Sequence, residues 1–214
     1  LNNFPDKSEK FINKNFIFRD GVIKSYSYYA ARYFNRSSNP KVIIGKDRWL
    51  FYRPEALQKN MPDPVDSGEN VIDDFCGNIP FDAKQLEQIK NYLVPIARLL
   101  DSRKIPFIIM IAPNKVSVYD EFLPGYYKIQ GTGRKRIDQL IDLCGRIKGI
   151  HIIDLRKKMM EQKSLNRLYF KSDTHWNWTG AYVAYSELID HLLRYNNLKK
   201  MVPSDFKYER RFDN

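Results

Sequence analysis

The feature that most constrains this chain is the alternation of helical and strand-like segments after Asp82. Apolar residues recur every three or four positions over residues 83–103, 133–147 and 178–195, which is the spacing of helices that bury one face. Two short apolar runs lie between these segments, at 106–112 and 149–155. Helices that alternate with short apolar strands build a sheet whose central strands run parallel. The sequence therefore predicts an α/β fold, with residues 106–112 as a fully buried strand.

Local signals place the boundaries of the first of these helices. Asp82 precedes the periodic segment and is predicted to cap the helix, while Pro95 inside it is predicted to cause a kink. The predicted buried face carries Leu86, Ile89, Leu93, Ala97 and Leu100.

The part of the chain before Asp82 follows a different pattern. Residues 1–40 predict an amphipathic helical lead-in with a break at Asp20-Gly21. Residues 41–52 contain two apolar runs around the turn Gly45-Lys46-Asp47-Arg48, which predicts a β-hairpin. Residues 60–80 are rich in Pro, Asp, Gly and Asn and predict a long surface loop.

Composition excludes several classes of protein. Hydrophobic residues make up 43% of the chain and aromatic residues 14%, so a core is available and global disorder is excluded. No apolar run approaches the roughly 20 residues of a membrane span. Cys76 and Cys144 lack metal-type or CxxC spacing. Two separate buried thiols are the simpler interpretation, and a disulfide between them is the alternative.

The net charge is strongly positive and unevenly distributed. The chain has 36 Lys and Arg against 25 Asp and Glu, which gives +11. Residues 128–171 hold twelve basic and four acidic residues, hence +8 of that total. The excess raises the hypothesis of a nucleic-acid-binding module, but no zinc-finger spacing, RNA-binding aromatic motif or basic heptad helix accompanies it. A field of this sign would equally concentrate an acidic glycan, and a solvated basic surface is the default interpretation.

The sequence KSDTHWNWTG at residues 171–180 carries the strongest local signal for chemistry. In an extended segment Asp173 and His175 would point to the same face. A carboxylate beside an imidazole fixes the tautomer of a general base and stabilises its charged form. Trp176 and Trp178 could wall such a site or stack on a sugar ring. The alternative is a helix-entry segment in which Asp173 caps the helix and His175 packs beneath Trp176.

Other candidates depend on their place in the predicted sheet. Asn114 and Lys115 follow the strand at 106–112, and loops at the carboxyl ends of parallel strands are where α/β proteins build sites. An amide there could face an oxyanion, although a simple turn explains Asn114 as well. His151 and His191 are interpreted as structural. Only Asp173 and His175 cluster in sequence, so no metal site and no cofactor is predicted.

Three segments together resemble a known family. They are VIIGKDRWLFY at 42–52, IMIAPNKVSVYDEFLP at 109–124 and LYFKSDTHWNWTGAYVAY at 168–185. In this order they are similar to the SGNH-hydrolase-like domain of the alginate O-acetyltransferase family, AlgJ and AlgX. The resemblance implies a three-layer α/β sandwich with a mostly parallel central sheet, spanning 41–214 and incomplete at its C-terminal end.

The resemblance also implies an activity and a place in the cell. Family members transfer acetyl groups to hydroxyls of an exopolysaccharide or cell-envelope glycan through a Ser-His-Asp triad, in which Asp173 and His175 supply the acid and base. Asn114, Lys115, Trp176 and Trp178 are the expected substrate-binding residues. One expected partner is a polysaccharide, and an anionic one would suit the basic charge of the chain. The other is a membrane acyltransferase that delivers the acetyl donor. Nucleic acid is not among them, and the expected location is periplasmic or otherwise extracytoplasmic, with a membrane anchor in a segment outside this chain.

The nucleophile is the element that the sequence does not supply. No serine stands in a G-x-S-x-G context, and Ser117 is the nearest to a site wall. We therefore expect the triad serine to lie beyond this chain, and the chain by itself to be inactive. Two alternatives are carried forward: a carbohydrate esterase that removes acetyl groups, and a non-catalytic glycan-binding or assembly protein.

Overall fold

The α/β part of the molecule is built as the alternation predicts. The computed structural model describes residues 18–53, 71–128, 134–195 and 198–206. Helix α4 (Ala83–Ser102) leads into strand β3 (Phe107–Ile111), and helix α6 (Arg136–Gly145) leads into strand β4 (Ile150–Asp154). The two strands pair in parallel, with Phe107 opposite Ile150 and Ile111 opposite Asp154.

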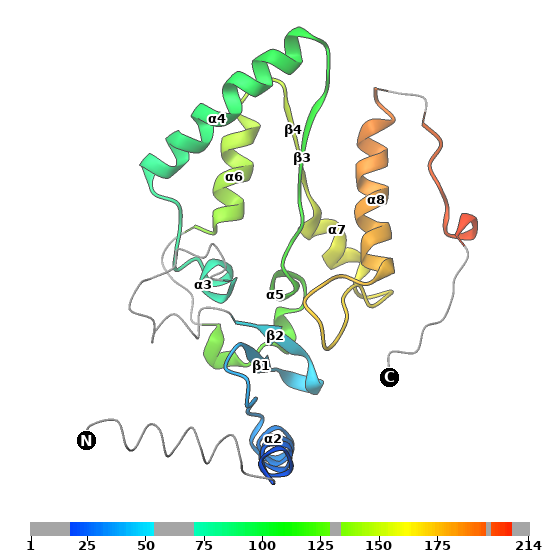
Figure 1. Cartoon of the computed structure of the whole chain (residues 1–214). Helices are drawn as coiled ribbons and strands as arrows, with labels where there is room; N and C mark the ends of the chain where they lie inside the picture. Colours follow the sequence, from blue (N-terminus) through cyan, green and yellow to red (C-terminus); the bar gives the residue numbers. More distant parts are fainter. Residues whose placement is uncertain (1–17, 54–70, 129–133, 196–197, 207–214) are drawn as a thin grey trace.

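The helices lie on both sides of these strands. Figure 1 shows α4 and α6 on one side of β3 and β4, and α8 (Trp178–Leu192) on the other. This arrangement has the three layers expected of the α/β class. Every residue of β3 is half-buried rather than fully buried, which corrects one expectation. Within the described residues β3 has a paired neighbour on one edge only, β4, so its other edge is less covered.

The helix boundaries follow from local chemistry. The Asp82 carboxylate accepts a hydrogen bond from the Gln85 backbone N–H, and the Gln85 side chain accepts one from the Asp82 backbone N–H, which forms the predicted cap. Helix α4 continues through Pro95. Strand β4 ends one residue before its predicted end, because Leu155 begins helix α7 (Leu155–Gln162), which the Asp154 side chain caps.

A β-hairpin and its aromatic residues form the other part of the core. Strands β1 (Val42–Ile44) and β2 (Leu50–Tyr52) pair antiparallel as predicted. Trp49, between the turn and β2, is buried and stacks on Tyr119 and Phe122 with ring centroids 4.4 and 4.7 Å apart. The aromatic cluster fixes the hairpin against the short helix α5 (Lys115–Val118) and the turn that follows it.

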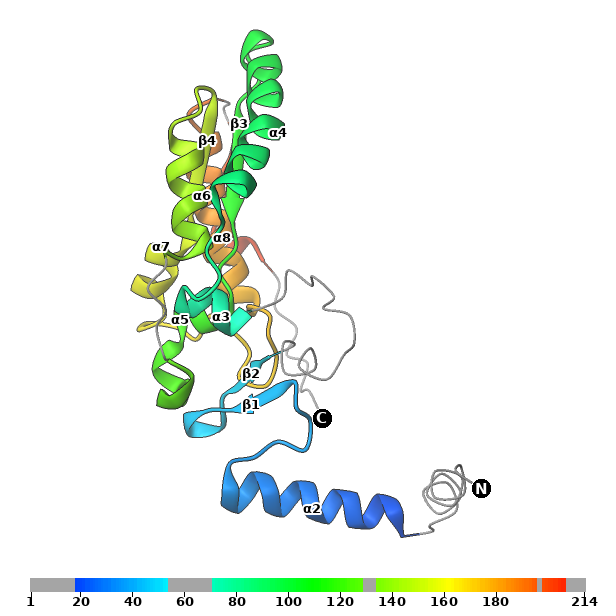
Figure 2. The same ribbon diagram turned by 90° about the vertical axis from the view of Figure 1, so that its left-hand side faces the viewer.

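The N-terminal helix is more regular than the sequence predicts. Helix α2 (Arg19–Phe34) includes Asp20 and Gly21 in its first turn, so the predicted break there is wrong. Figure 2 shows this helix beyond the hairpin, away from the strands β3 and β4, and Ala30 is its buried residue. Residues 1–17, which hold the predicted lead-in residues Phe11, Ile12 and Phe16, lie outside the described residues.

Two further expectations concern the middle of the chain. The predicted surface loop at 60–80 is wrong in part, because helix α3 (Val71–Cys76) buries Ile72 and Cys76; residues 60–70 lie outside the described part. Cys76 and Cys144 are both buried and both free thiols. None of the helices in the described part of the chain combines the length and apolar character that a membrane crossing needs.

Candidate active site

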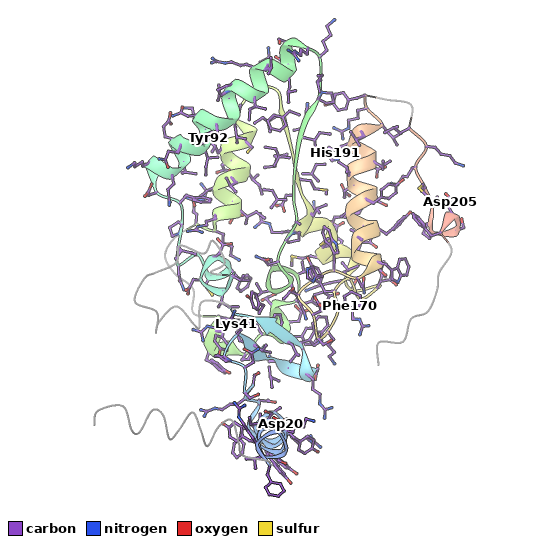
Figure 3. The ribbon with its side chains drawn as sticks, viewed as in Figure 1. Asp20, Lys41, Tyr92, Phe170, His191 and Asp205 are labelled. Atoms are coloured by element: carbon purple, nitrogen blue, oxygen red, sulfur yellow. The ribbon has the colours of Figure 1, made fainter. Side chains whose placement is uncertain are left out.

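The segment that carries Asp173 and His175 is a loop closed at its base. Tyr169 and Trp176 form an isolated antiparallel bridge, and the Phe170 N–H donates to the His175 carbonyl at 3.2 Å. Figure 3 labels Phe170 in this loop, beside the first turn of α8. The loop therefore presents residues 171–175 at a tip, and Asn177 then begins α8 by accepting a hydrogen bond from the Gly180 N–H.

Asp173 and His175 contact each other through a turn rather than along an extended strand. Residues 171–175 form a bend, and the Asp173 carboxylate oxygen Oδ1 accepts a hydrogen bond from the His175 backbone N–H at 2.8 Å. The same oxygen lies 2.6 Å from the imidazole Nδ1. The predicted extended geometry is corrected, but an Asx-type turn brings the two side chains together just as closely.

The electrostatics of this pair suit a charged carboxylate. The hydrogen bonds from the His175 backbone N–H and imidazole lower the pKa of the Asp173 carboxyl below its ordinary value. The His175 and Asp173 side chains are 80% and 54% exposed. Nδ1 faces Asp173, and Nε2 has no hydrogen-bond partner among the residues that the structure describes. The imidazole is therefore oriented by the carboxylate and open to solvent on its reactive side.

The ammonium group of Lys115 is bonded to the protein itself. Its side chain is buried, and Nζ donates to the carbonyl oxygens of Leu50, Lys171 and Asp173 at 2.7, 2.8 and 3.0 Å. An ammonium group has three N–H donors, and all three have protein acceptors here. Its charged group thus bonds to the loop and the hairpin, and the substrate-binding role that the resemblance implies for Lys115 stays a prediction.

Burial changes the acidity of this lysine. Loss of solvent lowers the pKa of the Lys115 ammonium to about 8; the charge of Asp173 opposes this change and that of Arg167 adds to it. The ammonium also lies over the Trp49 and Phe51 rings, 4.9 and 5.4 Å from their centroids. Cation–π attraction of this kind compensates part of the desolvation.

Asn114 lies beside a small cavity that adjoins the loop. The cavity has a volume of about 220 Å³ and is lined by Phe51, Tyr52, Val71, Asn114, Lys115, Val116 and Thr174. Asn114 is exposed and does not cap α5 with its side chain. Thr174, between Asp173 and His175, is a lining residue that sequence reasoning missed, because no pattern in the sequence shows that the two segments meet.

The two tryptophans lie in different surroundings. Trp176 is half-buried and packs against the core, while Trp178, the first residue of α8, is 59% exposed. Trp178 is thus the more accessible of the two rings, three positions after His175 in the sequence.

The remaining candidates lie elsewhere. Ser117 lines a larger cavity of about 690 Å³ together with Asp154 and Arg156, and no described serine forms a hydrogen bond with His175. His151 bonds to the Tyr195 hydroxyl at 2.7 Å, and His191 Nδ1 lies 2.9 Å from the Glu187 carbonyl. Over the described part of the chain, no group of three potential metal ligands lies together.

Half of the basic residues at 128–171 form ion pairs within the part of the chain that the structure describes. Six of the twelve form such pairs, several of them with acids from outside the segment. These residues are Lys128, Arg134, Lys148, Arg156, Lys158 and Lys163. Part of the charge that the linear sequence concentrates before Asp173 is therefore offset by acids from other parts of the fold.

Comparison with known families decides the relationship. The family model for the SGNH hydrolase-like domain of the acetyltransferase AlgX matches residues 42–212, most of the chain. The chain belongs to this family. The resemblance stated from the three sequence segments is thereby confirmed, and so is the SGNH-hydrolase-like class of fold.

Relatives in this family carry related names. The chain is 25% identical over 149 residues to the probable alginate O-acetylase AlgJ of Pseudomonas aeruginosa, covering 66% of this chain and 30% of that protein. For the protein of the same name from Pseudomonas putida the identity is 25% over 162 residues, covering 72% and 34%. The chain thus spans about a third of the length of these relatives.

A solved structure supports the fold independently. Bacillus cereus PatB1, in a structure with a sulfonyl adduct, superposes with a TM-score of 0.55 at 16% identity, covering 78% of this chain and 48% of that one. At this identity the likeness shows the fold alone.

Proposed function

We propose that this chain is the acid–base part of an O-acetyltransferase that acetylates hydroxyl groups of an extracytoplasmic polysaccharide. The observation that carries the proposal is the 2.6 Å contact between Asp173 Oδ1 and His175 Nδ1, with the other side of the imidazole exposed. Membership of the AlgX family supports acetyl transfer as the reaction, and the names of the Pseudomonas relatives support a polysaccharide acceptor.

The mechanism follows from the orientation of the imidazole. A serine outside the described residues attacks the acetyl carbonyl of the donor, and its proton passes to Nε2 of His175. The donor's leaving group takes that proton, which leaves an acetyl-serine. A sugar hydroxyl then attacks the carbonyl of the acetyl-serine and gives its proton to His175. His175 passes that proton to the departing serine oxygen, which restores the serine hydroxyl and the neutral imidazole. Throughout, Asp173 holds the tautomer and stabilises the imidazolium.

Exposure of the site suits a polymeric acceptor. A polysaccharide cannot enter a closed pocket, and His175 projects from a loop tip at the surface. We assign Trp178 to stacking on a sugar ring and Asn114, at the neighbouring cavity, to hydrogen bonding with the acyl oxygen. We place the protein in the periplasm or an equivalent compartment, where a membrane acyltransferase supplies the donor and a membrane anchor outside this chain holds it.

The same exposure favours one second candidate. Water reaches His175 as easily as a sugar does, so an acetyl-serine could be hydrolysed, which would make the protein a carbohydrate esterase. The two activities differ in the acceptor only, and a product assay separates them.

The test uses the complete gene product, an activated acetyl ester as donor and an acidic oligosaccharide as acceptor. We expect acetylated oligosaccharide by mass spectrometry, and a loss of about 1,000-fold in kcat for His175→Ala because general-base catalysis is removed. His151→Ala is the matched control, since His151 is also exposed and lies on β4. Release of acetate without transfer would support the esterase instead. Unchanged activity in His175→Ala would leave the non-catalytic glycan-binding protein as the better hypothesis.

A further inference from the structure

The loop that carries Asp173 has few contacts of its own to hold it. Its tip is a bend without helix or strand, and the Asp173 and His175 side chains are largely exposed. A general base must nevertheless keep its orientation closely, because a displacement of about 1 Å at a reacting group can cost a factor of about 100 in rate. The contacts that hold this loop in place must therefore come from the residues packed beneath it.

Lys115 provides these contacts. Its ammonium donates to two carbonyls of the tip, those of Lys171 and Asp173, and to the carbonyl of Leu50 in strand β2. The Lys171 carbonyl also accepts the Leu50 N–H at 2.9 Å, so the loop and the hairpin meet at one residue. Asp173 is thus held through its own backbone by a group that never reaches the surface.

The lysine itself is positioned by its surroundings. It is the first residue of α5, whose Val116 and Val118 are buried, and its Nζ lies over the Trp49 and Phe51 rings. The residue two positions earlier, Pro113, accepts a hydrogen bond at 2.5 Å from the buried hydroxyl of Tyr169, at the base of the same loop. The turn after β3 therefore contacts the loop at its base and at its tip.

We propose that Lys115 is a positioning residue of the active site, whose buried ammonium holds the Asp173–His175 loop in its catalytic geometry. The inference rests on the proposed function, but the geometry that it names can be tested without activity. Lys115 acts through Asp173 and does not touch substrate.

The lysine also makes the site dependent on pH. With a pKa of about 8, the ammonium loses its charge and one donor above that pH, so the hold on the loop weakens. The charged groups that face it are Asp173, which favours the ammonium, and Arg167, which disfavours it. We expect kcat to fall above pH 8 in the wild-type protein.

Two variants and a control test the proposal. Lys115→Met keeps the length and apolar stem but has no donors; Lys115→Arg keeps the charge at every accessible pH. The control is Lys163→Met, because Lys163 also donates to a backbone carbonyl, that of Val118 at 2.5 Å, and lies over an aromatic ring, that of Tyr119.

The kinetic readout is the pH profile of acetyl transfer by the complete gene product. Lys115→Met should lower kcat by about 100-fold, change KM little and abolish the alkaline fall. Lys115→Arg should restore most of kcat and move the alkaline fall to higher pH. Lys163→Met should retain the wild-type profile. An alkaline fall that persists unchanged in both Lys115 variants would overturn the proposal.

The structural readout is amide hydrogen exchange over residues 170–176. Lys115→Met should exchange faster there than both the wild type and Lys163→Met, and equal rates would also overturn the proposal. If Lys115→Met does not fold, the profile and exchange rates of Lys115→Arg decide. If His175→Ala is fully active, the proposed function fails, and the exchange result still decides whether Lys115 holds the loop.

Discussion

Replacement of Asp173 by Asn separates the catalytic role that we propose for this carboxylate from its structural role. Oδ1 of Asp173 accepts two hydrogen bonds, from the His175 backbone N–H at 2.8 Å and from Nδ1 at 2.6 Å. An Asn side chain keeps an oxygen for the backbone N–H, so the turn survives. The negative charge that stabilises the imidazolium is lost.

Asp173→Asn should have a small effect on the free energy of unfolding and a large effect on kcat. Because both side chains are more than half exposed, their ion pair should contribute no more than about 1 kcal/mol to folding. In Ser-His-Asp enzymes the same substitution lowers kcat by about 10,000-fold, or about 5 kcal/mol in the activation barrier. We expect a loss of at least about 100-fold here, since solvent screens part of the effect at this exposed site.

The assay is kcat for acetyl transfer, measured beside urea unfolding of the same preparation. Asp173→Ala serves for comparison, because it removes both hydrogen bonds and should also loosen the loop. A folded Asp173→Asn protein whose kcat lies within about threefold of the wild type would refute the reasoning. So would a loss of unfolding free energy large enough to account for the lost activity.

Three further substitutions test how the site is held, each by urea unfolding. Gly180→Ala should destabilise the fold by about 2 kcal/mol or more, because the new Cβ would collide with the Leu168 carbonyl. The control is Gly21→Ala, where nothing lies within 4 Å of the new Cβ, and its loss of unfolding free energy should be smaller. Tyr169→Phe should cost about 1–3 kcal/mol, because it leaves the Pro113 carbonyl without its buried donor; an unchanged stability would contradict this. Folding lowers the pKa of Lys115 from 10.5 to about 8, so between these pH values the unfolded chain binds more protons and the stability that Lys115 contributes rises with pH. This rise comes from removing the cost of a buried charge, even though one hydrogen bond to the loop is lost. The destabilisation by Lys115→Met should therefore grow from pH 8 to 10, and a constant difference would contradict the assignment.

Periodicity and local chemistry were sufficient for the elements of the α/β part. The apolar spacing of α4, its Asp82 cap and the parallel strands β3 and β4 are all properties of short stretches of chain, and the structure confirms them. Expectations failed where burial depends on distant residues. Residues 60–80 together are rich enough in Pro, Asp, Gly and Asn to predict a loop, yet Val71–Cys76 forms a helix that buries Ile72 and Cys76 in the core that the hairpin and α5 complete.

The candidate site divides in the same way. Asp173 and His175 are two residues apart, so the sequence could pair them, although it gave the wrong backbone conformation for the contact. Lys115 lies 56 to 65 positions from the Lys171 and Leu50 carbonyls that it bonds, and no local pattern predicts such partners. The ion pairs of the basic segment 128–171 could not be predicted for the same reason, because some of the acids in them, such as Glu187 and Asp101, lie elsewhere in the sequence.

The sequence by itself determined the class of fold, the family and the contact between Asp173 and His175, because periodicity, motif order and short spacing are all local properties. Only the tertiary structure decided that Lys115 is buried beneath the loop and that half of the basic residues at 128–171 are paired. Both depend on which distant carbonyls and carboxylates folding brings within hydrogen-bond distance. A charge in the sequence has no fixed role until its partners and its exposure to water are set.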